Sequence, residues 1–267
     1  MSSFPLVCSR VINPTYSSSI ITIARKGSLV LSPVQDIVFE LCAETLDTCL
    51  LAKSSGASRI ELCADLNVDG LTPSHALVQQ AVQLSGVPIF MLLRPRAGNF
   101  VYTAPEFNLI REDLLHGKSL GVSGFAVGVL HQDGTVDIER TRELVALAAP
   151  LEVTFHRAFD VTPSLPQALE DVIRTGSRRI LTSGGAPDVF LGADSLTNLV
   201  HLAANRIEIA AGGGLRAEGA AALVSTTGAR HFHGSVRLHN TSAVRLIQVA
   251  SKDVQHLVSS LQRGTIS

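Results

Sequence analysis

Two identical four-residue segments carry the clearest chemical signal in the chain. Glu-Leu-Cys-Ala occurs at residues 40–43 and again at residues 61–64. Side chains two residues apart on a strand share a face, so we expect Glu40 to point with Cys42 and Glu61 with Cys63. On adjacent parallel strands the two thiols would lie about 4.8 Å apart, a gap that two metal–thiolate bonds of about 2.3 Å can span. Soft thiolates select Cu(I), whereas the alternative is that both cysteines are small buried hydrophobic residues.

A second group of candidates is ionic. Glu40, Glu61, Arg94, Arg96 and His156 each stand at or near the end of an apolar run. Burying such charges costs several kcal/mol unless they are paired. They therefore predict a polar plug, a site for an anionic or polyol ligand, or a general acid/base group that includes His156. The catalytic candidates are Glu40, Glu61 and His156.

Glycine-rich turns form the third group. They occur at residues 183–185, 212–214 and 234–235. Backbone N–H groups of such turns hold phosphate in many barrel enzymes, although tight turns also need glycine for positive φ angles. With the arginines, they give the following expected substrate-binding set: Arg94, Arg96, Arg157, Ser183, Gly184, Gly213, Gly214 and Ser235.

The elements that must position these residues follow a repeated plan of apolar run, turn and helical pattern. The runs are residues 37–42, 59–63, 87–93, 124–130, 151–156, 179–182, 207–211 and 230–233. Continuous apolar runs are typical of parallel strands that are covered on both faces. We predict a single (β/α)8 barrel, with an irregular eighth unit as an open point and an open doubly wound sheet as the alternative. In such barrels the site lies at the carboxyl ends of the strands.

Several helix signals accompany the runs. Thr72, followed by proline, has the pattern of an N-cap. Thr103 and Glu106 have the spacing of a capping box. Cys49 and Leu50 fall on the predicted inward stripe of the first helix, so we expect Cys49 to be a packing residue.

Composition bounds the function classes. The chain has 267 residues, 46% of them hydrophobic, with 22 basic and 23 acidic residues. This balance gives no sign of a nucleic-acid or membrane partner, and the chain should be soluble because no apolar stretch approaches the ~18–20 residues that span a bilayer. Four cysteines are too few for a secreted disulfide framework, so we expect free thiols in a reducing compartment.

The first 35 residues differ from the rest in composition. They contain eight serines and no acidic residue. That is the composition of an organelle transit peptide, and a tail without a targeting role is the alternative. We therefore predict an N-terminal extension over residues 1–35 and one barrel domain over residues 36–267.

The chain resembles the copper homeostasis protein CutC family from about residue 37 to residue 262. Six ordered motifs carry the resemblance: Phe-Glu-Leu-Cys at 39–42, Gly-Ala-Ser-Arg-Ile-Glu-Leu-Cys at 56–63, Gly-Leu-Thr-Pro-Ser at 70–74, Arg-Pro-Arg-Ala-Gly-Asn-Phe at 94–100, Thr-Phe-His-Arg-Ala-Phe-Asp at 154–160 and Arg-Ile-Leu-Thr-Ser-Gly at 179–184. The chain departs from the family pattern at Ala97, Asn99, His231 and Gly234. Its segment between Ser235 and the last predicted helix is also shorter than in other family members.

The resemblance implies a TIM-like barrel, cytoplasmic residence, a homo-oligomer and a role in copper handling. The cysteines proposed to bind Cu(I) in animal-type members correspond to Cys42 and Cys63. The expected function is therefore copper homeostasis, with Cu(I) held by this pair at the barrel mouth. The alternative is a barrel enzyme for a small phosphorylated or polyol substrate, with Glu40, Glu61, Arg94, Arg96 and His156 in the site. If residues 1–35 are a transit peptide, the location would instead be a plastid or another organelle.

Overall fold

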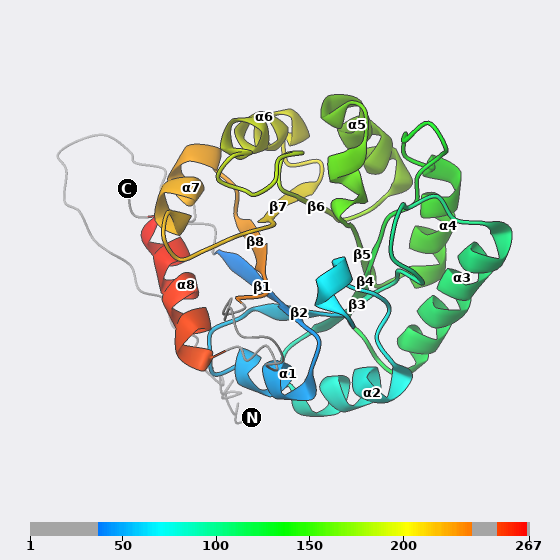
Figure 1. The fold of residues 1–267 in the computed structure, drawn as a ribbon, viewed down its shortest axis with the longest axis horizontal. Helices are drawn as coiled ribbons and strands as arrows, with labels where there is room; N and C mark the ends of the chain where they lie inside the picture. Colours follow the sequence, from blue (N-terminus) through cyan, green and yellow to red (C-terminus); the bar gives the residue numbers. More distant parts are fainter. Residues whose placement is uncertain (1–36, 237–249, 266–267) are drawn as a thin grey trace, which may run out of the picture. The chain divides into compact units, whose positions relative to one another are not determined.

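The chain forms a closed barrel of parallel strands (Figure 1). The computed structural model describes residues 37–236 and 250–265. Each strand pairs with the next along the chain, and β1 pairs with β8 to close the ring. The strands are β1 (Val38–Ala43), β2 (Arg59–Leu62), β3 (Ile89–Leu92), β4 (Gly124–Val127), β5 (Glu152–Phe155), β6 (Arg179–Thr182), β7 (Glu208–Gly212) and β8 (His231–Gly234). Every predicted run overlaps one of these strands, so the barrel is confirmed and the open sheet is wrong.

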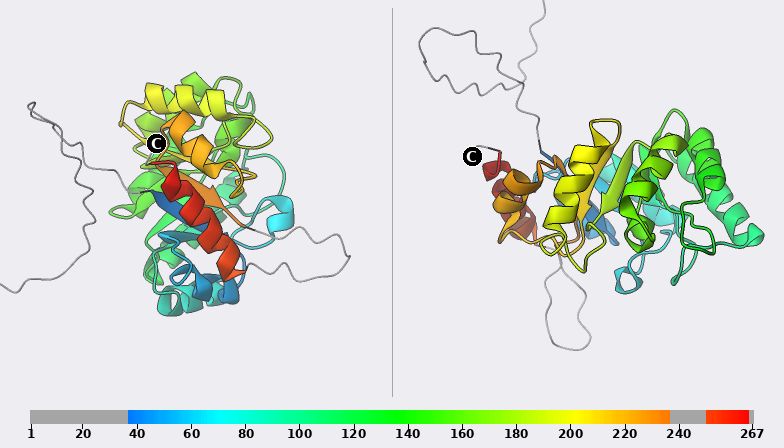
Figure 2. Two further views of the ribbon diagram at one scale, coloured as in Figure 1. Left: turned by 90° about the vertical axis from the view of Figure 1, so that its left-hand side faces the viewer. Right: turned by 90° about the horizontal axis from the view of Figure 1, so that it is seen from above.

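Helices surround the barrel on its outer side (Figure 2). They are α1 (Leu46–Ala52), α2 (His75–Leu84), α3 (Ala104–Ser119), α4 (Ile138–Ala148), α5 (Leu165–Thr175), α6 (Ala193–Ala203), α7 (Ala220–Thr227) and α8 (Ser251–Arg263), with short 3-10 helices at Leu66–Val68 and Arg157–Val161. Among the described helices, none combines the length and apolar composition needed to cross a bilayer. The expected N-terminal extension lies outside the described residues, as do residues 237–249 of the eighth unit, whose irregularity stays a prediction.

Local signals at the helix starts are confirmed in one case and wrong in another. Thr103 and Glu106 form the predicted capping box at the start of α3. Thr72 does not cap α2, because Ser74 does so by accepting the backbone N–H of Leu77. Thr72 instead accepts the backbone N–H of Arg94 at 2.9 Å, which ties two loops of the barrel mouth together.

The alternation of side chains along the strands divides the interior into two parts. On β1, Phe39 and Leu41 pack in the large apolar core with the helices, whereas Cys42 joins a small cluster with Cys63 and with residues of β3 and β4. Successive strand residues point to opposite faces, so Glu40 and Cys42 point into the barrel. Cys49 of α1 is fully buried as predicted, but Leu50 is 46% exposed and does not belong to the inward stripe.

A buried ionic layer fills the barrel near the starts of the strands. Arg59 pairs with Glu40, and Arg179 pairs with Glu208. Both guanidinium groups also lie 3.6 Å from the carboxylate of Glu152. This layer could not be predicted from sequence, because a charged residue that opens an apolar run has the pattern of a surface position.

Candidate functional site

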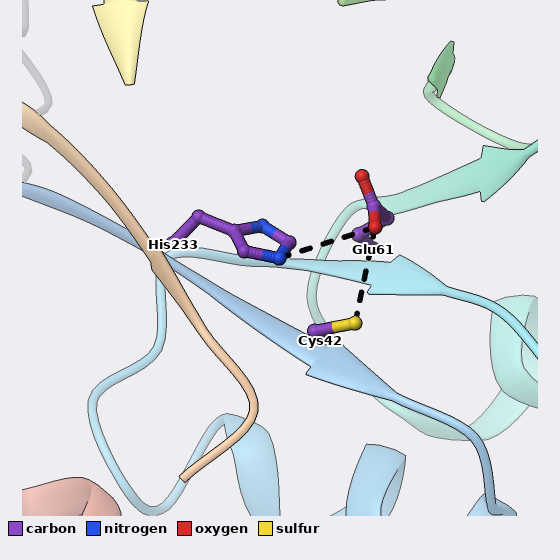
Figure 3. Close-up of side chains that lie close together, drawn as sticks. All are labelled: Cys42, Glu61 and His233. Carbon is purple, nitrogen blue, oxygen red and sulfur yellow. Dashed lines mark hydrogen bonds and ion pairs between the residues drawn. The ribbon is translucent and has the colours of Figure 1, made fainter. Parts of the chain in front are cut away.

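The first part of the site is a cluster of Cys42, Glu61 and His233 at the barrel mouth (Figure 3). Cys42 of β1 lies opposite Glu61 of β2 in the strand register, and His233 comes from β8. Sγ of Cys42 is 3.8 Å from Oε1 of Glu61, and Nε2 of His233 is 4.0 Å from the same oxygen. One potential ligand atom from each residue lies within 4.8 Å of the other two, which is the spacing of a metal-binding cluster.

Cys63 extends this cluster by a second thiol. Its Sγ lies 3.7 Å from Sγ of Cys42 and 3.5 Å from the carbonyl oxygen of Ala43. The hydrogen bond with Cys63, together with burial, raises the pKa of the Cys42 thiol well above its usual value. Cys42 is therefore protonated without a metal, and binding of a metal by its sulfur would release a proton.

A buried carboxylate fixes the orientation of His233. Glu40 lies 2.8 Å from Nδ1 of His233 and pairs with Arg59 on its other side. Burial alone would raise the pKa of Glu40, but the Arg59 charge and the His233 hydrogen bond outweigh it and hold this pKa well below its usual range. Burial opposes the charge on His233, yet the carboxylate of Glu61 and its other partners raise the His233 pKa well above its usual value. Nδ1 of His233 is thus bound to Glu40, and Nε2 of the same ring faces Glu61 of the cluster.

This contact pairs Glu40 with a different histidine from the one expected. The sequence suggested His156 as the partner of the glutamates, whereas Glu40 contacts His233, 193 residues along the chain. The only sequence signal for His233 was its place at the end of the last strand. Burial, the largest influence, and the charge of Glu40 raise the pKa of Glu61, although His233 acts in the opposite direction.

A cavity of about 570 Å³ opens beside the cluster. Of the expected site residues, the following line it: Cys42, Glu61, Arg94, His156, Arg157, Gly213, Gly214 and Ser235. Glu40, Cys63, Arg96, Ser183 and Gly184 are not among its lining residues. The expected residues thus give the cavity one thiol, one carboxylate, two arginines and His156, and its wall also contains Asp69, Asp160, Arg216 and His233.

Arg96 stabilises a loop beside the cavity. Its Nε contacts Glu106 at 2.5 Å, and its Nη atoms donate to the backbone carbonyl groups of Ala97, Asn99 and Val101. These contacts tie the guanidinium to the loop after β3 and to Glu106 of α3. Its geometry supports a structural role in place of the expected ligand contact.

The turn after β6 is also occupied by internal hydrogen bonds. Asp160 accepts the backbone N–H groups of Ser183 and Gly185 at 3.1 Å. The backbone N–H of Gly184 donates to Oγ1 of Thr182 at 2.8 Å. These groups are thus not available to a phosphate, and the glycines of this turn serve the tight backbone path instead.

His156 is held as a neutral ring. Its Nδ1 accepts the backbone N–H of Ala158 at 3.1 Å, so the proton of the neutral ring is on Nε2. Burial and then the charge of Arg94 lower the pKa of His156 to about 3, which disfavours the expected acid/base role near neutral pH. Gly128, which the sequence did not single out, leaves room for the ring, because a Cβ there would lie 2.3 Å from Cε1 of His156.

Comparison with known proteins shows which family the chain belongs to. The chain matches the CutC family model over residues 37–238. It is 41% identical to a CutC family protein of Chromobacterium violaceum over 79% of this chain and 85% of the relative, and 41% identical to one of Vibrio vulnificus over 80% and 86%. A crystal structure of a protein from Streptococcus agalactiae assigned to copper homeostasis as CutC superimposes with a TM-score of 0.70 at 33% identity, over 74% of this chain and 98% of that one. The chain belongs to the CutC family.

Proposed function

We propose that the protein serves copper homeostasis by binding Cu(I) through Cys42 and Cys63. The observation that carries the proposal is the 3.7 Å separation of the two Sγ atoms inside the barrel mouth. Two metal–thiolate bonds of about 2.3 Å across this gap would meet at roughly 105–110°. That angle is far from linear and leaves a side open for a third donor.

His233 is the third donor that the cluster favours. Its Nε2 faces the cluster, whereas its Nδ1 is bound to the Glu40 carboxylate at 2.8 Å. A carboxylate on the second ring nitrogen of a metal-binding histidine fixes the tautomer and increases the basicity of the ligand. Two thiolates and an imidazole form a soft donor set, which suits Cu(I) better than Mg²⁺ or Ca²⁺.

An anaerobic Cu(I) titration against a competing chelator tests this assignment. The Cys42→Ser, Cys63→Ser double variant should lose tight binding, because serine oxygen is a poor ligand for Cu(I). Cys49→Ser is the matched control, since Cys49 is a fully buried thiol on α1. Its affinity should equal that of the unmodified protein. Equal affinity in the double variant would show that these two cysteines are not the ligands.

A second candidate function is an enzyme acting on a small molecule. The observation that favours it is the cavity of about 570 Å³, which is far larger than an ion requires and falls within the ~300–1,000 Å³ typical of small-molecule sites. Glu61 and His233 at its edge are the groups that would handle protons. Thermal-shift measurements with phosphorylated metabolites and polyols test this candidate. The enzyme function would be disfavoured if no compound raised the melting temperature even far above millimolar concentration.

A further inference from the structure

Arg94 is a buried cation whose charge has no partner within the described part of the chain. It is 5% exposed, and no described carboxylate lies within ion-pair distance of it. Arg59 and Arg179, the other arginines that are buried among the described residues, each have a glutamate partner. A buried charge without a counter-charge is costly. Arg94 lines the cavity, so a bound anion is the natural source of the missing charge.

The contacts of Arg94 leave one donor unused. Its Nη1 donates to the carbonyl groups of Val68 and Gly70, and its Nη2 to that of Gly98. Its Nε is buried and has no hydrogen-bond partner among the described residues. The Nη atoms thus hold the surrounding loops in place, and Nε remains as a donor of fixed direction.

His156 supplies a second unused donor in the wall of the same cavity. Its Nδ1 accepts from Ala158, so Nε2 carries the proton, and this buried atom also lacks a partner among the described residues. Phe100 lies near both side chains: the centroid of its ring is 5.1 Å from the ring centroid of His156 and 5.1 Å from Cζ of Arg94. Burial and the Arg94 charge keep His156 neutral, with a pKa of about 3. A neutral donor beside a cation favours an acceptor oxygen with negative charge.

We propose that the cavity binds a small carboxylate, which accepts hydrogen bonds from Nε of Arg94 and from Nε2 of His156. The inference goes beyond Cu(I) binding and deepens the second candidate function, because it names the class of ligand. A carboxylate matches this site better than a phosphate does. It brings a single charge to the single unpaired guanidinium among the described residues that line the cavity.

The proposal is tested by NMR of the metal-free protein labelled with ¹⁵N in its histidine rings. Lactate and acetate are the probes, and inorganic phosphate is the comparison anion. The Nε2–H signal of His156 should shift and saturate with a carboxylate, whereas the signal of the helix-borne His201 should not. No saturable shift with either carboxylate up to tens of millimolar would overturn the proposal, as would a larger shift with phosphate.

Two substitutions of His156 form a matched pair for affinity measurements by calorimetry. In His156→Asn the amide oxygen replaces Nδ1 as acceptor for Ala158, but nothing replaces Nε2. In His156→Gln the amide nitrogen reaches the place of Nε2 and keeps a donor in the cavity wall. Loss of a hydrogen bond to a charged group should weaken carboxylate binding by roughly tenfold or more in the Asn variant. The Gln variant should stay within about threefold of the unmodified protein, and equal affinities for the Asn variant and the unmodified protein would refute the role of Nε2.

The Cys42→Ser, Cys63→Ser variant separates this proposal from the other two. Carboxylate affinity should be unchanged in it, even when Cu(I) binding is lost. If the protein bound carboxylates but turned over no substrate, the carboxylate site would be supported. Only the enzymatic candidate function would then be contradicted. A loss of carboxylate binding in a folded double variant would contradict the assignment to Arg94 and His156.

Discussion

The neutral state of His156 makes the stability of the fold depend on pH in a defined direction. The pKa of this ring is about 3 in the folded protein and about 6.5 in an unfolded chain. As the pH falls below 6.5, the unfolded chain binds a proton that the folded protein does not bind. The stabilisation is therefore present above pH 6.5 and is lost as the pH falls toward 3.

The magnitude follows from the shift itself. Below pH 6.5 the free energy of unfolding should fall by about 1.4 kcal/mol per pH unit through this residue alone. Between pH 7.5 and 5.0 the loss amounts to about 2 kcal/mol. His156 is only 5% exposed, so solvent screening reduces this figure little.

Urea unfolding of the metal-free protein and of His156→Gln, from pH 5.0 to 7.5, measures this contribution. The Gln variant cannot titrate, so its stability relative to the unmodified protein should improve by about 2 kcal/mol toward pH 5. The difference between the two proteins cancels the contributions of other groups, such as His231, whose pKa burial and then Arg179 lower to about 4. A difference that stays constant within about 0.5 kcal/mol over this range would refute the neutral, buried ring.

Two further predictions concern the groups around the cluster and the cavity. Glu40→Gln should destabilise the fold by about 3–5 kcal/mol at pH 7, because it leaves the Arg59 charge buried without its main partner. The control Glu152→Gln should cost about 1 kcal/mol or less, since Glu152 is 44% exposed and 3.6 Å from Arg59; equal losses by urea unfolding would contradict this ranking. Gly128→Ala should cost about 1–3 kcal/mol by overpacking and should weaken lactate binding, because its Cβ would displace the ring of His156. Unchanged lactate affinity in calorimetry would show that the position of the His156 ring does not affect carboxylate binding.

The barrel could be predicted from sequence because each of its units is a local pattern. The apolar run at 179–182 gives β6 with the same bounds, and the spacing of Thr103 and Glu106 gives the cap of α3. The cap of α2 was misplaced by two residues because Thr72 and Ser74 have the same local chemistry. The two residues differ in a contact between loops: Thr72 accepts the backbone N–H of Arg94 and so does not cap the helix.

The site could be predicted only in part, because its contacts join strands that are distant in sequence. Cys42 and Cys63 were placed side by side by the repeat of one strand–helix unit, and the structure has their Sγ atoms 3.7 Å apart. The pairing of Glu40 with His233 depends on closure between the first and last strands, which no local pattern encodes. The unpaired charge of Arg94 was equally hidden, since a sequence shows an arginine but not what surrounds its guanidinium.

The pairing of β1 with β8 also sets an order in time. The chain is synthesised from its N-terminus at about 5–20 residues per second, and 193 residues separate Glu40 from His233. The ribosome therefore produces both thiols of the barrel mouth roughly 10–40 s before the imidazole that completes their cluster. During that interval β8 is not yet available to pair with β1, so the barrel that buries Cys42 and Cys63 cannot be closed. For this fold, the last strand both closes the barrel and completes the cluster that the first strand begins.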